Sequence, residues 1–344
     1  MSEPVAPEPG APEAAAPVTE PPPPTTRSNR KRVVDAVRVA FLALVLLAVG
    51  YALTRGWDDV SASFRRIGTG SLALGLVLAL VSPALTVLGW RVLLADLGSR
   101  LHLAPASGVF FVGQLGKYLP GSVWSVVAQA DMARRLGVPR RRTAVVALIT
   151  IALSALCGIV VGLPALPALL TRGQANLPTW FLVLVVGGLL VALWPPVLNR
   201  AIALLFRVLR REPLEHDLSL AAVALSTMWF TLSWLAGGAS IWVMATSLAD
   251  AGADPGHLAL VSICGYLLAA GIGMFSFVVP AGVGVRDGVL VVLLATSMPV
   301  AAATAVVVVA RFYSVVADVA WAGIGWLWAR AHHLLPDSKV DTHV

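Results

Sequence analysis

The apolar run at residues 257–298 constrains the fold more than any other part of this 344-residue chain. It is about twice the roughly 20 residues that one membrane helix needs, and glycines, a proline and an Arg-Asp pair interrupt it at residues 271–288. Only residues 288–298 lie between Asp287 and Pro299, and they make about 16 Å of helix, about half a bilayer. The pattern therefore predicts two half-helices that meet inside the membrane. Non-helical backbone at that depth must be buried in protein or line a polar path.

A similar pattern occurs in the first half of the chain. Pro120 and Pro139 align with Pro280 and Pro299, and the cation Lys117 again lies beside a Pro-Gly break. Two prolines with the same spacing in both halves indicate an internal repeat, at about residues 105–169 and 265–329. The first copy predicts a second broken hairpin at residues 105–132.

Composition places the chain among polytopic membrane proteins, because 58% of its residues are hydrophobic and only 12% are charged. Residues 1–32 are rich in Pro and Ala and are predicted to be a disordered tail. The membrane domain is expected at residues 33–330, followed by a short tail at 331–344. The net charge of +7 does not indicate nucleic-acid binding, because the basic residues flank apolar segments instead of forming a basic module with interleaved aromatics.

The fold class predicted is an all-α polytopic membrane protein with six full transmembrane helices and two re-entrant broken-helix hairpins. The full crossings are predicted at residues 33–54, 71–94, 143–169, 179–197, 218–248 and 300–328. Three crossings separate the hairpins, so the hairpins enter from opposite faces and form an inverted repeat. Basic loops place both termini in the cytoplasm, with the protein in the cell (inner or plasma) membrane.

Two shorter patterns predict local structure. Residues 199–211 alternate arginines with large apolar residues and are predicted to form an amphipathic surface helix. Gly158 and Gly162 form a Gly-x-x-x-Gly within a predicted crossing, which indicates close packing against a neighbouring helix.

Three positive residues, Lys117, Arg286 and Arg311, are predicted to lie inside the membrane. A cation near the bilayer centre costs from about 3 to over 10 kcal/mol, so each needs an anionic or hydrated partner. Arg311 and Asp318 are seven residues apart and share one helical face. One interpretation is an anion-binding path for a phosphate headgroup. The other is an internal Arg311–Asp318 pair that fixes helix packing.

The residues around each break can line such a path. Asp287 begins a predicted half-helix, where its carboxylate either caps the helix or poises the neighbouring cation. Gly282 and Gly284 let backbone N–H groups approach a ligand. The candidate substrate-binding residues are Lys117, Tyr118, Pro120, Gly121, Pro280, Gly282, Gly284, Arg286, Asp287, Arg311 and Asp318.

No motif in the sequence supports catalysis. There is no nucleotide-binding loop of the Walker type, no Gly-x-Ser-x-Gly and no His-Glu-x-x-His. Cys157 and Cys264 both lie within apolar runs and are predicted to be small buried hydrophobic residues instead of disulfide partners or metal ligands. We therefore expect a protein that is not an enzyme and has no catalytic residue, metal or cofactor.

Two motifs carry a resemblance to a known family. Residues 116–124 read GKYLPGSVW, residues 280–288 read PAGVGVRDG, and Arg311 follows in the last predicted crossing. Together they resemble the membrane domain of lysylphosphatidylglycerol synthases, a flippase-like family that includes stand-alone membrane proteins. The resemblance covers about residues 33–330 and implies movement of a phospholipid or lipid-linked anionic headgroup between leaflets.

The chain departs from this family in two respects. Many members have an acidic residue after the second Pro-Gly, where this chain has Arg286 and Asp287. Only the short segment 331–344 follows Arg330, so we expect no soluble aminoacyl-transferase domain.

Two other functions remain open from the sequence: a non-catalytic membrane partner of a glycosyltransferase or lipid-modifying enzyme, and a small-solute transporter. A homo-oligomer is also compatible with the sequence.

Overall fold

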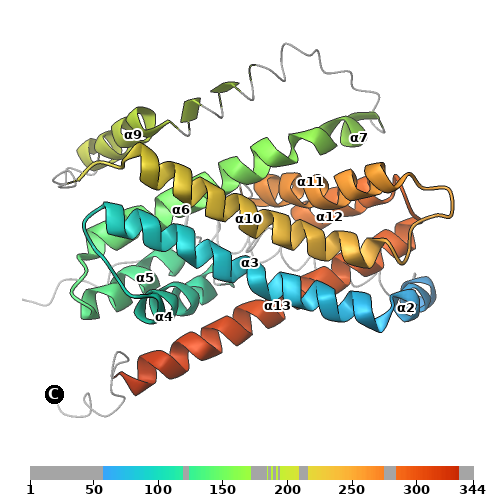
Figure 1. Ribbon diagram of the computed structural model, residues 1–344, viewed down its shortest axis with the longest axis horizontal. Helices are drawn as coiled ribbons and strands as arrows, with labels where there is room; N and C mark the ends of the chain where they lie inside the picture. Colours follow the sequence, from blue (N-terminus) through green and yellow to red (C-terminus); the bar gives the residue numbers. More distant parts are fainter. Residues whose placement is uncertain are drawn as a thin grey trace, which may run out of the picture. The chain divides into compact units, whose positions relative to one another are not determined.

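A computed structural model describes residues 57–118, 124–171, 194–208, 216–274 and 284–332, and residues 184, 187, 188, 191 and 192 between them. Every regular element in these residues is a helix (Figure 1). The predicted crossing at 33–54 and both predicted tails, apart from Ala331 and His332, lie outside the described residues. The predicted crossing at 179–197 lies mostly outside them.

Five described helices are long and apolar enough to cross a membrane. They are α3 (Thr69–Asp96), α6 (Arg140–Gly162) with the short helices η2 (Leu163–Ala165) and α7 (Leu166–Thr171) that follow it, α10 (Leu220–Ala245), α11 (Pro255–Met274) and α13 (Val300–Ala331). All but α11 coincide with crossings predicted from the sequence. Two shorter helices are α2 (Trp57–Arg66) and α9 (Pro195–Val208), and α9 begins four residues before the predicted amphipathic helix.

The first predicted hairpin consists of α4 (Leu103–Gln114), the 3-10 turn η1 (Leu115–Tyr118) and α5 (Trp124–Arg135). α4 and α5 have 12 residues each, about 18 Å, which is shorter than the bilayer core. The second consists of α11 and α12 (Val285–Leu294), and α12 spans only 10 residues.

The two arms of the second hairpin are unequal, in contrast to the predicted pair of half-helices. α11 continues through Gly271 and Gly273 to Met274, so it is 20 residues long, about 30 Å. These glycines do not end the helix, because each lies against a neighbour. A Cβ on Gly271 would come within 2.6 Å of Ile159 Cγ1, and one on Gly273 within 3.0 Å of Arg286 Cβ.

Corresponding helix boundaries in the two halves are 160 residues apart, the same separation as between Pro120 and Pro280. α4 ends at residue 114 and α11 at 274, while α6 begins at 140 and α13 at 300. Pro139 and Pro299 are the N-cap residues of α6 and α13, with φ of −58° and −57°. The two long helices run in opposite directions along the molecule (Figure 1).

The hairpin of each half packs on the long helix of the other half. α4 packs on α13, and α11 packs on α6. Close approach in the second pair depends on glycines of α6. A Cβ on Gly162 would come within 2.4 Å of the backbone nitrogen of Leu268, and one on Gly158 within 3.2 Å of the carbonyl oxygen of Leu267. The close packing predicted for this Gly-x-x-x-Gly is therefore confirmed.

α3 and α10 are joined by a regular series of hydrogen bonds. Three serines of α10, spaced seven residues apart, donate from their hydroxyls to carbonyls of α3 that are also seven residues apart. The bonds are Ser226 Oγ to Gly89 O (3.1 Å), Ser233 Oγ to Ser82 O (2.7 Å) and Ser240 Oγ to Gly75 O (2.7 Å). A seven-residue period keeps one face of each helix against the other along the whole contact.

Buried apolar side chains form two clusters, one around each hairpin. Phe110 of α4 lies in the first, and Leu267 of α11 and Leu293 of α12 lie in the second. α10 takes part in both, with Phe230 in the first and Met244 in the second. The α3–α10 pair thus packs against both hairpins.

Candidate functional site

Two glycines bring the arms of the first hairpin into contact. A Cβ on Gly113 would lie 2.3 Å from Gln129 Cγ, and one on Gly116 would lie 2.5 Å from the backbone nitrogen of Ser125. Any side chain at either position would push α4 and η1 away from α5. Gln129 is buried and its Oε1 has no hydrogen-bond partner among the described residues. Within the described part of the chain, a buried polar atom without a partner therefore lies beside Gly113 near the end of α4.

The first break is tied to the last helix by an ion pair. Lys117 Nζ lies 2.8 Å from Asp318 Oδ1 and 2.7 Å from Asp318 Oδ2. The Lys117 side chain is 36% exposed and that of Asp318 only 13%. This pair spans 201 residues of sequence and crosses between the two halves, since Lys117 belongs to the first hairpin and Asp318 to α13.

Arg311 lies half-buried on α13, seven residues before Asp318. The structure places both on one helix as predicted. Asp318 pairs with Lys117, a cation from the other half of the chain. Ser314, between Arg311 and Asp318, donates its hydroxyl to the carbonyl of Ala310 at 2.9 Å.

α12 begins after Gly284, whose φ of +88° is in the left-handed region. Glycine adopts this backbone without the steric cost that a Cβ imposes. Asp287 Oδ2 accepts a hydrogen bond from the backbone nitrogen of Gly284 at 3.2 Å. Asp287 therefore caps the start of α12, and its negative charge complements the positive end of the helix.

Arg286 is held by an aromatic ring instead of by a carboxylate. Its guanidinium carbon lies 4.7 Å from the centroid of the Tyr266 ring, a distance at which cation and ring attract. Tyr266 is itself fixed between Trp234, whose ring centroid is 6.0 Å away, and Gly237, where a Cβ would meet the Tyr266 ring at 2.7 Å.

The guanidinium of Arg286 makes no hydrogen bond or ion pair with another residue that the structure describes. It is half-buried at the first turn of α12, beside the N–H groups of a helix N-terminus. Stacking on Tyr266 orients the guanidinium without using its N–H donors. The arrangement can accept an oxyanion, to which arginine binds in a two-pronged manner.

Several predicted site residues cannot be placed. Pro120, Gly121, Pro280 and Gly282 lie outside the described residues, and so does the side chain of Tyr118. The structure brings Lys117 together with Asp318, and Arg286 together with Gly284 and Asp287 at the start of α12.

Tyr266 and Trp234 were not predicted from the sequence. Both lie in apolar runs where an aromatic residue gives no signal of its own. The available signal was Gly237 on α10, because a glycine inside a crossing marks a place where a large side chain from a neighbour is received.

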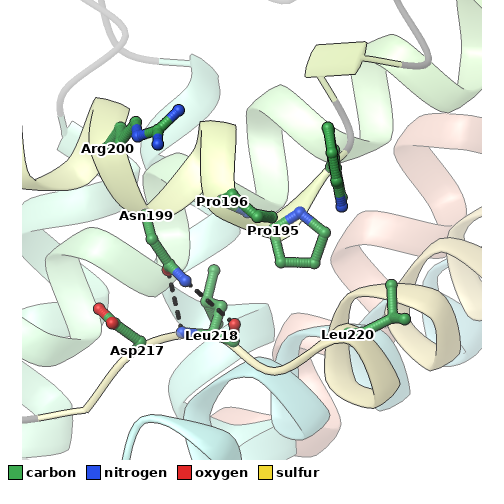
Figure 2. Close-up of a pocket in the computed structure, with 8 residues that line it drawn as sticks. Pro195, Pro196, Asn199, Arg200, Asp217, Leu218 and Leu220 are labelled. Atoms are coloured by element: carbon green, nitrogen blue, oxygen red, sulfur yellow. Dashed lines mark hydrogen bonds between the residues drawn. The ribbon is translucent and has the colours of Figure 1, made fainter.

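A cavity of about 520 Å³ lies elsewhere, where α9 approaches the start of α10. Asn199 points from α9 towards the segment before α10 (Figure 2) and makes two hydrogen bonds with Leu218, to its carbonyl at 3.1 Å and from its backbone nitrogen at 3.0 Å. These bonds satisfy the side-chain amide, and no predicted site residue lines the cavity.

The five long apolar helices define the class: a multi-pass helical membrane protein. A sequence profile described as lysylphosphatidylglycerol synthase TM region matches residues 36–322. Because this match covers most of the chain, the protein belongs to that family, which links it to membrane-lipid metabolism or translocation. A comparison with curated proteins found no significant match.

Proposed function

We propose that this protein moves an anionic lipid, a phospholipid or a lipid-linked headgroup, between the leaflets of the membrane. The observation that carries the proposal is Arg286, half-buried, stacked on Tyr266 and without an acceptor among the described residues. A guanidinium in such a position is stabilised when an anion supplies the missing acceptors. A phosphate headgroup fits this requirement, while its acyl chains remain in the hydrocarbon.

The architecture proposed for this function has six full crossings and two re-entrant hairpins that enter from opposite faces. The constant offset of helix boundaries and the opposite directions of α6 and α13 support an inverted repeat. Inverted repeats with broken helices are typical of alternating-access transporters. Both termini are proposed to be cytoplasmic, with the protein in the cell membrane.

The three cations have different proposed roles. Arg286 makes the first contact with the headgroup, together with N–H groups at the start of α12. Lys117 is neutralised by Asp318 in this state, so it binds phosphate only after that pair opens. Arg311, on the same helix as Asp318, continues the path. The break residues Tyr118, Pro120, Gly121, Pro280 and Gly282 are proposed to form its walls.

A transport assay with a matched control tests this proposal. Proteoliposomes with acyl-labelled fluorescent phosphatidylglycerol are treated with dithionite, which reduces only label in the outer leaflet. Arg286→Gln should lower the initial rate of lipid movement about tenfold or more, because a hydrogen bond to a charged group contributes about 1.5–3 kcal/mol. The control is Arg330→Gln, because Arg330 also stacks on an aromatic ring, Trp326 at 5.3 Å, but is exposed.

Three outcomes would contradict the proposal. Equal rates for Arg286→Gln and wild type would remove the assigned role of Arg286. If the purified protein moves no lipid but copurifies with a glycosyltransferase or a lipid-modifying enzyme, it is a partner protein. If it takes up a soluble anion with no lipid movement, it is a small-solute transporter.

A further inference from the structure

α9 has one apolar face that packs on the helical bundle. Phe206 is 6% exposed and lies in the apolar cluster around the first hairpin. Leu198 and Ile202, eight and four residues before it, pack against the same cluster. Residues four apart lie on one side of a helix, so these three define the bundle face of α9.

A second apolar face of α9 has no protein neighbour to cover it among the described residues. Leu204 is 56% exposed and Val208 is 71% exposed, and Ala201 is also exposed. Their spacing of three and four residues puts them in one stripe, well over 90° around the helix from the bundle face. Trp194, immediately before α9, is 59% exposed. Exposed aromatic and aliphatic side chains on a short helix are typical of membrane interfaces.

Two arginines flank this stripe on the side away from the bundle. Arg200 and Arg207 are seven residues apart, so they share one edge of α9, and both are exposed. Neither makes a hydrogen bond or ion pair with another residue that the structure describes. In Figure 2 Arg200 points away from the segment that carries Asp217 and Leu218. No described residue therefore occupies the N–H donors of either guanidinium group.

We infer that α9 lies in the headgroup region of an anionic leaflet and gathers anionic phospholipids around itself. The stripe of Ala201, Leu204 and Val208 enters the acyl chains, and Arg200 and Arg207 bind lipid phosphates at its edge. An apolar stripe beside two exposed arginines is complementary to an anionic bilayer surface in both shape and charge. This binding surface is separate from the two breaks and does not depend on lipid transport.

The test measures which lipids lie beside α9. A fluorescent dye is placed at Leu204→Cys in full-length protein that carries Cys157→Ala and Cys264→Ala, reconstituted in phosphatidylcholine with a low fraction of phosphatidylglycerol. Either lipid is then supplied with brominated acyl chains, which quench only a nearby dye. Quenching per mole of brominated phosphatidylglycerol should exceed that of phosphatidylcholine about fivefold, the effect of about one arginine at an anionic surface.

Matched variants separate the two parts of the inference. Arg200→Gln with Arg207→Gln should bring the quenching ratio close to one, whereas Arg65→Gln with Arg66→Gln on α2 should leave it unchanged. A dye at Ala203→Cys, which lies between the arginines and the bundle face, should be quenched less than the dye at Leu204→Cys.

Either of two results would overturn the inference. No quenching of the Leu204→Cys dye by either lipid would mean that α9 is not in the bilayer but is covered by water or by another protein. Equal quenching by both lipids in the wild-type background would mean that the arginines do not select anionic lipid.

Discussion

Replacing Asp318 by asparagine should destabilise the protein by about 2 kcal/mol, a cost between those of breaking an exposed and a fully buried ion pair. The substitution keeps the shape of the side chain and removes only its charge, so Lys117 loses both carboxylate contacts, at 2.7 and 2.8 Å. The half-buried lysine then loses the negative charge of Asp318. Lys117→Met should cost a similar amount, because it leaves the carboxylate of Asp318, 13% exposed, without this ammonium group.

The magnitude follows from the burial of the pair. Exposed ion pairs contribute about 0–1 kcal/mol, and breaking a fully buried pair by removing one partner costs about 3–5 kcal/mol. The Lys117–Asp318 pair lies between these limits, since the two side chains are 36% and 13% exposed. We therefore expect a coupling free energy of about 1–3 kcal/mol in a double-mutant cycle.

The chain contains a matched control for this cycle. Arg140 and Asp131 form an ion pair at the same N–O distance, 2.7 Å, but their side chains are 56% and 52% exposed. Both cycles are measured as free energies of unfolding in mixed micelles titrated with denaturing detergent. The Arg140–Asp131 cycle should give a coupling below about 1 kcal/mol. A coupling for Lys117–Asp318 no larger than this control would refute the argument that burial strengthens the pair.

Three further substitutions test the packing that supports the breaks, each by thermal unfolding in detergent. Ser240→Ala removes one bond of the α3–α10 series and should cost about 0.6 kcal/mol, the average for a hydrogen bond between membrane helices, whereas a loss above about 2 kcal/mol would mean that the series is strongly cooperative. Gly162→Ala drives a methyl group into the backbone at Leu268 and should cost at least about 1–3 kcal/mol, whereas Gly70→Ala, with nothing within 4 Å, should not destabilise. Gly284→Ala should cost about 1–2 kcal/mol because of its positive φ, and an unchanged midpoint would mean that α12 can start elsewhere.

Much of the helical framework could be predicted because hydropathy and proline positions are properties of the local sequence. Pro139 and Pro299 disfavour the continuation of a preceding helix, and each stands immediately before a long apolar segment, so the starts of α6 and α13 follow from local chemistry. The close contact at Gly158 and Gly162 was predictable for the same reason, since only small residues let two backbones approach.

The contacts of the charged residues with distant segments could not be predicted. Helical periodicity put Arg311 and Asp318 on one face, but nothing in it indicates that Asp318 pairs with Lys117, which is 201 residues away in the sequence. Tyr266 as the support of Arg286 was equally inaccessible, since nothing local distinguishes it from a core aromatic residue. The length of α11 was misjudged because Gly271 reads as a helix breaker until its packing against α6 is known.

The two halves repeat their helix boundaries but not their charges. At the offset that aligns Pro120 with Pro280, Lys117 falls on Phe277, Arg286 on Val126, Arg311 on Ile151 and Asp318 on Gly158. Both halves therefore share the positions of their helices, but none of these four charged residues has a charged equivalent in the other half. In the proposed alternating mechanism each half adopts the conformation that the other half had before. In that second end state the residues equivalent to Lys117 and Asp318 are uncharged, so no equivalent ion pair forms. A pair contributing about 1–3 kcal/mol would then favour one end state of the empty protein by about 5- to 150-fold. A bound phosphate that competes with Asp318 for Lys117 removes that preference, so substrate itself would release the protein to change state.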